Sequence, residues 1–76
     1  MTVQIKRSVT IRGHRTSFSL EKPFLDELQA MAQARGISLA ALVGEVDEAR
    51  PRMTNLSSAL RIHVLAHVKA LAARTG

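Results

Sequence analysis

The residues best suited to chemistry in this sequence are four cations near its N-terminus. Lys6, Arg7, Arg12 and Arg15 fall within residues 1–20, where there is no acidic residue. The net charge of the whole chain is +5. A group of cations without acids attracts polyanions, and nucleic acid is the first such partner to expect of a small protein. The alternative is a basic surface that is simply solvated.

The other reactive side chains form no pattern typical of catalysis or metal binding. His63 and His67 have a spacing that can hold a metal on one helix face, but Val64 stands where a zinc protease needs glutamate. The chain has no cysteine, which excludes disulfides and thiolate metal sites. Ser57 and Ser58 suit helix capping better than nucleophilic attack. We therefore expect no metal, no cofactor, no small-molecule substrate and no enzymatic activity.

The four cations lie among residues that alternate as β-strands do. Residues 2–6, 8–11 and 16–20 alternate apolar and polar side chains and are rich in β-branched types. Gly13 lies between the second and third runs and permits a hairpin, although Arg-Gly is not a favoured turn pair. The third run must pair with the N-terminal runs, with another chain, or with both.

The alternation assigns a face to each residue of the third run. Phe18 and Leu20 share one face, which we expect to point to the core. Arg15, Ser17 and Ser19 share the opposite face and are expected to point outward.

Helical spacing follows over three ranges. The first covers residues 23–35, begins with a proline and is followed by Gly36, which suits a left-handed helix end. The second covers residues 39–49, between the capping residue Ser38 and a proline two residues past its end. The third covers residues 55–73 and is apolar over a wide arc. That arc suits either the chain's own core or contact with a second copy.

Size limits what the chain can do alone. A chain of 76 residues buries a small core and, without disulfides or metals, often needs a partner chain. Gly44 inside the second helix suits either a close helix–helix approach or an exposed position. No apolar run is long enough to span a membrane, so we expect a cytoplasmic protein.

Two segments resemble a known family. Residues 6–21, KRSVTIRGHRTSFSLE, and residues 55–61, NLSSALR, resemble a small bacterial family described only as ribbon-helix-helix domain proteins. The strand, the proline at the first helix and the segment 36–39 are also similar to the wider Arc and MetJ class. The resemblance implies one domain over residues 1–76, mainly α-helical, with a short N-terminal β-ribbon in residues 1–20 and an added third helix.

The resemblance further implies an intertwined homodimer, with assembly beyond a dimer left open. One strand from each chain would pair across a two-fold axis above a shared helical core. Phe18, Leu20, Leu42 and Val46 are the residues expected in that dimer core.

The resemblance also implies double-stranded DNA as the partner, read by the ribbon in the major groove. Arg15, Ser17 and Ser19 would face the bases, with Arg15 able to bond guanine O6 and N7 together. The phosphates would meet basic side chains and the start of the second helix, namely Lys6, Arg7, Arg12, Ile37, Ser38 and Leu39.

The function expected on this basis is that of a DNA-binding transcription regulator. The alternative is a protein-interaction or assembly module of the same fold without sequence-specific DNA binding, because Ser17 and Ser19 are short for base reading. The extra N-terminal strand could extend the ribbon, or it could cover the face that would enter the groove.

Overall fold

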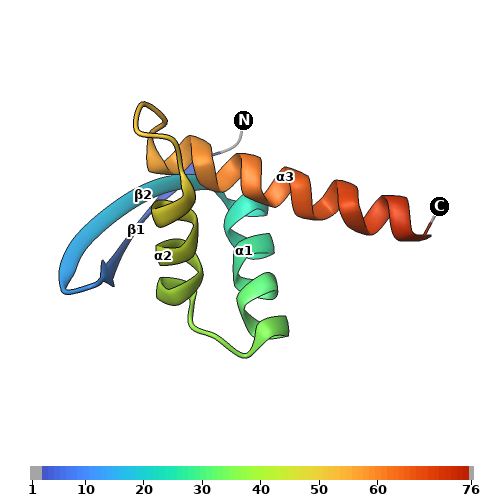
Figure 1. Ribbon diagram of the computed structural model, residues 1–76, viewed down its shortest axis with the longest axis horizontal. Helices are drawn as coiled ribbons and strands as arrows, with labels where there is room; N and C mark the ends of the chain where they lie inside the picture. The colour runs from blue at the N-terminus through green and yellow to red at the C-terminus, as the bar shows by residue number, and fades with distance from the viewer. Residues whose placement is uncertain (1–2, 76) are drawn as a thin grey trace.

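The computed structural model of the protein describes residues 3–75, so Thr2, which the first predicted strand run includes, lies outside the described residues. Two antiparallel strands, β1 (Gln4–Ile11) and β2 (His14–Glu21), are followed by three helices, α1 (Lys22–Arg35), α2 (Leu39–Ala49) and α3 (Leu56–Thr75) (Figure 1). This is the predicted fold class, a short N-terminal ribbon followed by helices.

The first two predicted runs form one continuous strand, β1. It pairs with β2 of the same chain through a two-residue turn, with Ile11 opposite His14. The turn residues Arg12 and Gly13 have φ angles of 48° and 81°. Positive φ at both central residues is what a tight type I′ hairpin turn requires. The segment around Phe18, expected to pair across a two-fold axis, therefore has a partner strand within its own chain.

Each of the first two helices has a recognisable beginning or end. The helix α1 follows β2 directly and ends at Gly36, whose φ of 70° is left-handed. Ser38 caps α2, because its Oγ accepts a hydrogen bond from the Ala41 amide at 3.0 Å. At α3, Asn55 Oδ1 accepts from the Ser58 amide at 2.8 Å. The helix boundaries expected from the sequence differ from these by one residue at the start of α1, by one at the start of α3 and by two at its end.

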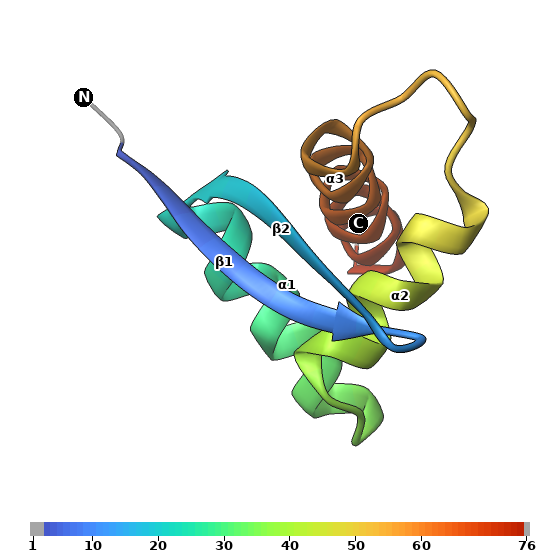
Figure 2. The same cartoon turned by 90° about the vertical axis from the view of Figure 1, so that its left-hand side faces the viewer.

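The helices lie on one side of the hairpin, and α3 lies beside β2 (Figure 2). Their shared core includes four fully buried leucines, each contributing roughly 1.5–3 kcal/mol through burial; they are Leu20, Leu28, Leu42 and Leu60.

The residues expected in a dimer core are already buried in one chain. Phe18 and Val46 are 3% and 7% exposed, and Leu20 and Leu42 are fully buried. A second copy is therefore not needed to remove these side chains from water.

Gly44 brings α2 close to the ribbon. It is buried, and a Cβ at this position would lie 3.3 Å from the Ile11 Cγ2 of β1. The close approach is thus between a helix and a strand, and it is neither the helix–helix approach nor the exposed position considered from the sequence.

Candidate nucleic-acid interface

The hairpin has one face turned away from the helices. Residues directly opposite in an antiparallel pair point to the same side, and Lys6 faces Ser19, Ser8 faces Ser17 and Thr10 faces Arg15. These residues alternate with those that pack on the helices. The outward face holds the Gln4–Glu21 pair at its far end, and we call the rest of it, namely Lys6, Ser8, Thr10, Arg15, Ser17 and Ser19, the ribbon face.

The residues predicted to face bases are all on the ribbon face. Arg15 and Ser17 are exposed, and Ser19 is half-buried. The Ser19 amide donates a hydrogen bond to the Ser57 Oγ at 3.1 Å, so the beginning of α3 lies against β2 there. Ser19 therefore offers less free surface than the other two residues.

The N-terminal strand extends the ribbon. Because β1 pairs edge to edge with β2 along the whole strand, it lies in the plane of the sheet and does not cover the ribbon face. It also adds three outward side chains, Lys6, Ser8 and Thr10. Ser8 and Thr10 are not among the residues predicted to contact DNA, although their alternation with Lys6 places them on the same face.

Three basic residues of β1 and the turn were predicted to contact phosphate, and their surroundings differ. Lys6 and Arg7 are both exposed, but as neighbours in a strand they point to opposite faces. Arg12 binds acids of α2, with guanidinium nitrogens 3.3 Å from Asp47 Oδ2 and 3.5 Å from Glu48 Oε2. Arg12 thus fastens the hairpin tip to α2.

The beginning of α2, the second predicted phosphate contact, lies near the hairpin tip. Ser38 is exposed, while Ile37 and Leu39 are half-buried. An open groove of about 500 Å³ is lined by residues of both the tip and α2, including Ser38 and Glu48. A phosphate near Ser38 would meet the partial positive charge of the helix end, with an acidic side chain farther along the groove.

Most acids of the protein form ion pairs, whereas three cations of the hairpin strands form none. Among residues 3–75, Lys6, Arg7 and Arg15 have no side-chain hydrogen bond or ion pair. By contrast, the carboxylates of five acids contact a cation within 3.5 Å; these acids are Glu21, Asp26, Glu45, Asp47 and Glu48. The hairpin therefore presents uncompensated positive charge to solvent.

The only acid of the strands, Glu21, is held at the far end of the ribbon. Arg61 Nε donates to Glu21 Oε1 at 2.9 Å, and Gln4 Nε2 donates to Oε2 at 3.1 Å. The Arg61 hydrogen bond, followed by that of Gln4, lowers the pKa of Glu21 from 4.5 to about 2. The pair could not be predicted from the sequence, since no local rule joins residues 40 positions apart.

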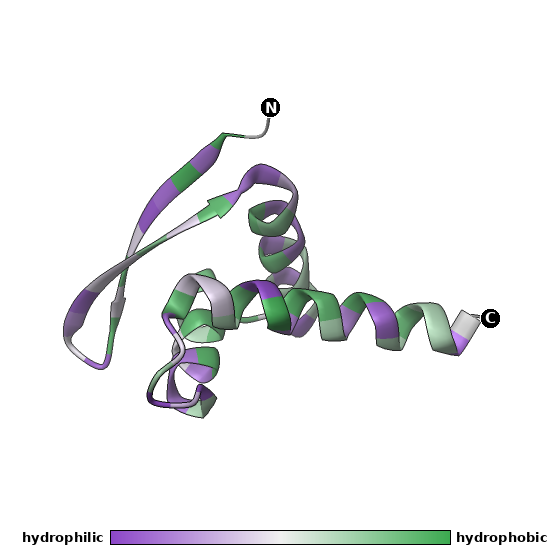
Figure 3. Ribbon diagram, turned by 90° about the horizontal axis from the view of Figure 1, so that it is seen from above, coloured by the Kyte–Doolittle hydropathy of each residue, from purple (hydrophilic) through white to green (hydrophobic). Residues whose placement is uncertain are grey.

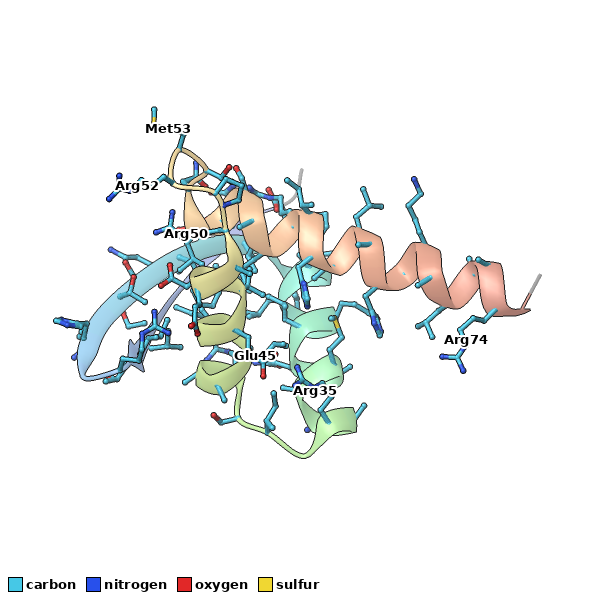
Figure 4. The ribbon with its side chains drawn as sticks, in the orientation of Figure 1. Arg35, Glu45, Arg50, Arg52, Met53 and Arg74 are labelled. Carbon is cyan, nitrogen blue, oxygen red and sulfur yellow. The ribbon has the colours of Figure 1, made fainter. Side chains whose placement is uncertain are left out.

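A second ion pair joins α1 and α2. Arg35 makes two hydrogen bonds to Glu45, at 2.7 and 2.9 Å (Figure 4). This contact lowers the pKa of Glu45 and raises that of Arg35. As in the Glu21 pair, the carboxylate stays ionised and the arginine balances its charge.

Within residues 3–75, no cluster of three or more His, Cys, Asp or Glu side chains is arranged to hold a metal ion. His63 is exposed on α3 and His67 is half-buried. No helix in the same part of the chain has the length and apolar character needed to cross a membrane.

The chain matches a model of a known protein family. A family model described as a ribbon-helix-helix domain matches residues 4–68, from the beginning of β1 into the second half of α3. No curated protein and no solved structure matches the chain.

Proposed function

Because the chain belongs to the ribbon-helix-helix domain family, whose members are in general DNA-binding regulators, we propose that it is a transcription regulator that inserts its β1–β2 hairpin into the major groove of DNA. It acts by binding, with no catalytic step, and as a bacterial regulator it works in the cytoplasm.

The observation that carries this proposal is the ribbon face. Among residues 3–75, it carries the cations Lys6 and Arg15, which have no side-chain partner, whereas five of the six acids are paired with cations. The major groove of B-DNA, about 12 Å wide, admits a two-stranded β-ribbon. Both strands of such a ribbon are available from one chain.

Residues on and beside the ribbon face have different roles in this proposal. Arg15 bonds guanine O6 and N7, and the hydroxyl of Ser17 bonds a nearby base edge. Lys6 and Arg7 contact phosphates on either side of the groove, which sets the register of the protein on DNA. The beginning of α2 at Ser38 adds a phosphate contact through its amides.

The protein binds DNA as a homodimer in this proposal. Two copies, each with one ribbon, would reach two half-sites about one helical turn apart. Doubling the contacts would raise the affinity well above that of one ribbon.

A second function is favoured by one feature of the same face. Ser8, Thr10, Ser17 and Ser19 have short side chains, and short hydroxyls discriminate poorly among bases. A protein-interaction module that keeps the fold without sequence-specific DNA binding would also carry such a surface, since fold alone does not fix function.

Fluorescence anisotropy with a labelled duplex tests the proposal. We expect binding at low salt that weakens steeply as salt rises, because phosphate counterions are released. Arg15→Ala should cost about 1–3 kcal/mol, and Lys6→Ala should reduce the salt slope by about 1.

Arg74→Ala is the matched control, because Arg74 is an exposed cation at the far end of α3 (Figure 4). It should change affinity much less than Arg15→Ala does. Absence of duplex binding at low salt, or equal effects of Arg15→Ala and Arg74→Ala, would reject the proposal.

A further inference from the structure

The loop between α2 and α3, residues 50–55, is held in shape by its own hydrogen bonds. Arg50 Nε donates to Asp47 Oδ1 at 2.7 Å, and Arg50 Nη1 donates to the Thr54 carbonyl. The Thr54 amide donates to the Pro51 carbonyl at 3.0 Å, and the proline ring further restricts the backbone. The guanidinium of Arg50 is therefore engaged within the loop, and the loop positions the side chains at its tip.

Arg52, at the tip of this loop, is a free cation. It is exposed, and its side chain has no hydrogen bond or ion pair in the part of the chain that the structure describes. Residues 50–76 include no acidic residue, so neither the loop nor α3 supplies a carboxylate to neutralise it. Arg52 thus presents positive charge to solvent from an ordered loop.

The loop stands on the β2 side of the ribbon. The Ser19 amide of β2 donates to Ser57 Oγ at 3.1 Å, and Arg61 Nε donates to Glu21 Oε1 at 2.9 Å. These two contacts hold the beginning of α3 against β2. Because the loop leads directly into α3, β2 lies between β1 and the loop (Figure 2).

The side chain of Arg52 is directed to the same side of the molecule as the hairpin. It extends from the loop toward the side on which β1 and β2 lie (Figure 4). Seen from above, the hairpin and the beginning of α3 lie at one end of the molecule, and the C-terminal end of α3 lies at the other (Figure 3). A duplex that receives the ribbon therefore also comes toward Arg52.

A ribbon that lies in the major groove has a phosphate backbone along each of its two edges. On the β1 side, the proposed function assigns Lys6 and Arg7 to phosphate. On the β2 side, the arginine and lysine content of the strand is Arg15 alone, and this residue is assigned to a base. The backbone on the β2 side thus has no cation from the strands, and Arg52 stands beside it.

From these observations we propose that Arg52 binds a phosphate of the DNA backbone on the β2 side of the ribbon. The ribbon is then held between the cations of β1 and a cation of the α2–α3 loop. A guanidinium can bond two phosphate oxygens together, and the contact fixes the position of the ribbon without reading sequence. Because the loop is already ordered, little conformational entropy is lost on binding. The inference rests on the proposed function and adds to it a contact from a different element.

Fluorescence anisotropy with a labelled duplex over a series of salt concentrations tests this contact. Arg52→Ala should reduce the salt slope by about 1 for each copy of the chain bound, because one phosphate fewer is neutralised. The fold-loss of affinity should be the same on two duplexes of unrelated sequence. Arg52→Lys should keep most of the slope, because the charge remains.

Arg74→Ala is the matched control, because Arg74 is also an exposed arginine but lies at the far end of α3 (Figure 4). It should leave the salt slope close to that of the wild type. Should the wild type bind the duplex while Arg52→Ala and Arg74→Ala have the same slope, the inference is wrong and the proposed function stands. Should the wild type not bind the duplex, both are wrong.

Because the chain has no cysteine, Arg52→Cys can carry a single photoactivated cross-linker. At saturating protein concentration it should link to the duplex efficiently, whereas Arg74→Cys with the same label should link weakly. This second measurement reports proximity to DNA and does not depend on the charge that the substitution removes. Circular dichroism verifies that each variant keeps its helices. Equal cross-linking of the two variants would overturn the inference.

Discussion

At the scale of single residues, the tip of the hairpin carries the largest conformational demand. Arg12 has a positive φ of 48°, and a non-glycine residue in the left-handed region costs about 1–2 kcal/mol. Its ion pairs with Asp47 and Glu48 offset part of that cost, although exposed pairs contribute only about 0–1 kcal/mol each. Gly13, the next residue, has no such cost because it lacks a Cβ.

Replacing Gly13 should therefore destabilise the protein. At a φ of 81°, Gly13→Ala is expected to lower the free energy of unfolding by about 1–2 kcal/mol, measured by urea unfolding with circular dichroism. His14→Ala is the control, because it truncates the neighbouring exposed side chain without that backbone demand. Equal stability of Gly13→Ala and the wild type would contradict the assigned turn.

The turn illustrates what a sequence can predict about single residues. The glycine between two alternating runs predicted the hairpin, since turn chemistry is local. The binding of Arg12 to Asp47 could not be predicted in this way, because the two residues are 35 positions apart and meet only after α2 has packed. The prediction of Arg12 as a phosphate contact did not take that partner into account.

The Glu21–Arg61 pair predicts how the stability of the fold depends on pH. The pKa of Glu21 is about 2 in the folded protein against an ordinary value of 4.5, so the stabilisation from this group is present above pH 4.5. It should be lost as the pH falls from about 4.5 toward 2. In Arg61→Leu this acid-dependent loss should be smaller, because the main cause of the lowered pKa is gone.

The measurement is thermal unfolding of both proteins between pH 6 and pH 2, with Arg74→Leu as a control for the loss of a cation elsewhere on α3. The control should follow the wild type. Parallel pH profiles of Arg61→Leu and the wild type would show that the pair does not stabilise the fold.

At the scale of elements, the contact between α2 and β1 depends on one small residue. Gly44 is buried, and its missing Cβ leaves room for Ile11 at 3.3 Å. Glycine inside a helix costs about 1 kcal/mol relative to alanine. The close approach of helix and ribbon compensates for that cost.

A larger side chain at Gly44 should separate α2 from the hairpin. Gly44→Val is expected to destabilise the protein by about 1–3 kcal/mol through overpacking, measured by urea unfolding. Ala41→Val, which introduces the same side chain at an exposed position of α2, should cost only a few tenths of a kcal/mol. The account of this contact would be wrong if the two variants were equally stable.

The order and type of the elements could be predicted from the sequence. Gly36 and Ser38 mark the break between α1 and α2 through local hydrogen bonding, and alternation marks the strands. The contact partner of Gly44 could not be predicted, since nothing local distinguishes a glycine that faces a strand from one that faces a helix.

At the scale of the whole molecule, the sequence left one question about pairing open. An unpaired strand edge is satisfied equally by the N-terminal runs or by another chain, so periodicity could not choose between them. In the structure, β1 pairs with β2 of the same chain, and Phe18 is buried without a second copy. The ribbon face could be predicted from alternation, but its freedom from cover required the structure.

The charge pattern of the whole molecule is visible partly in the sequence and partly only in the structure. The excess of cations in residues 1–20 is visible in the sequence. That Arg15 and Lys6 stay unpaired while Glu45 and Asp47 are neutralised is visible only in the fold. This separation leaves positive charge on the hairpin, which supports the proposed contact with DNA.

The central claim is that the ribbon face contacts DNA, and amide NMR mapping tests it most directly. Isotope-labelled protein is titrated with a duplex at low salt, and shifts are assigned residue by residue. We expect the largest changes at Lys6, Ser8, Arg15 and Ser17, with little change in the second half of α1. Largest changes on α1 or on the C-terminal half of α3, or no change at any residue, would contradict the claim.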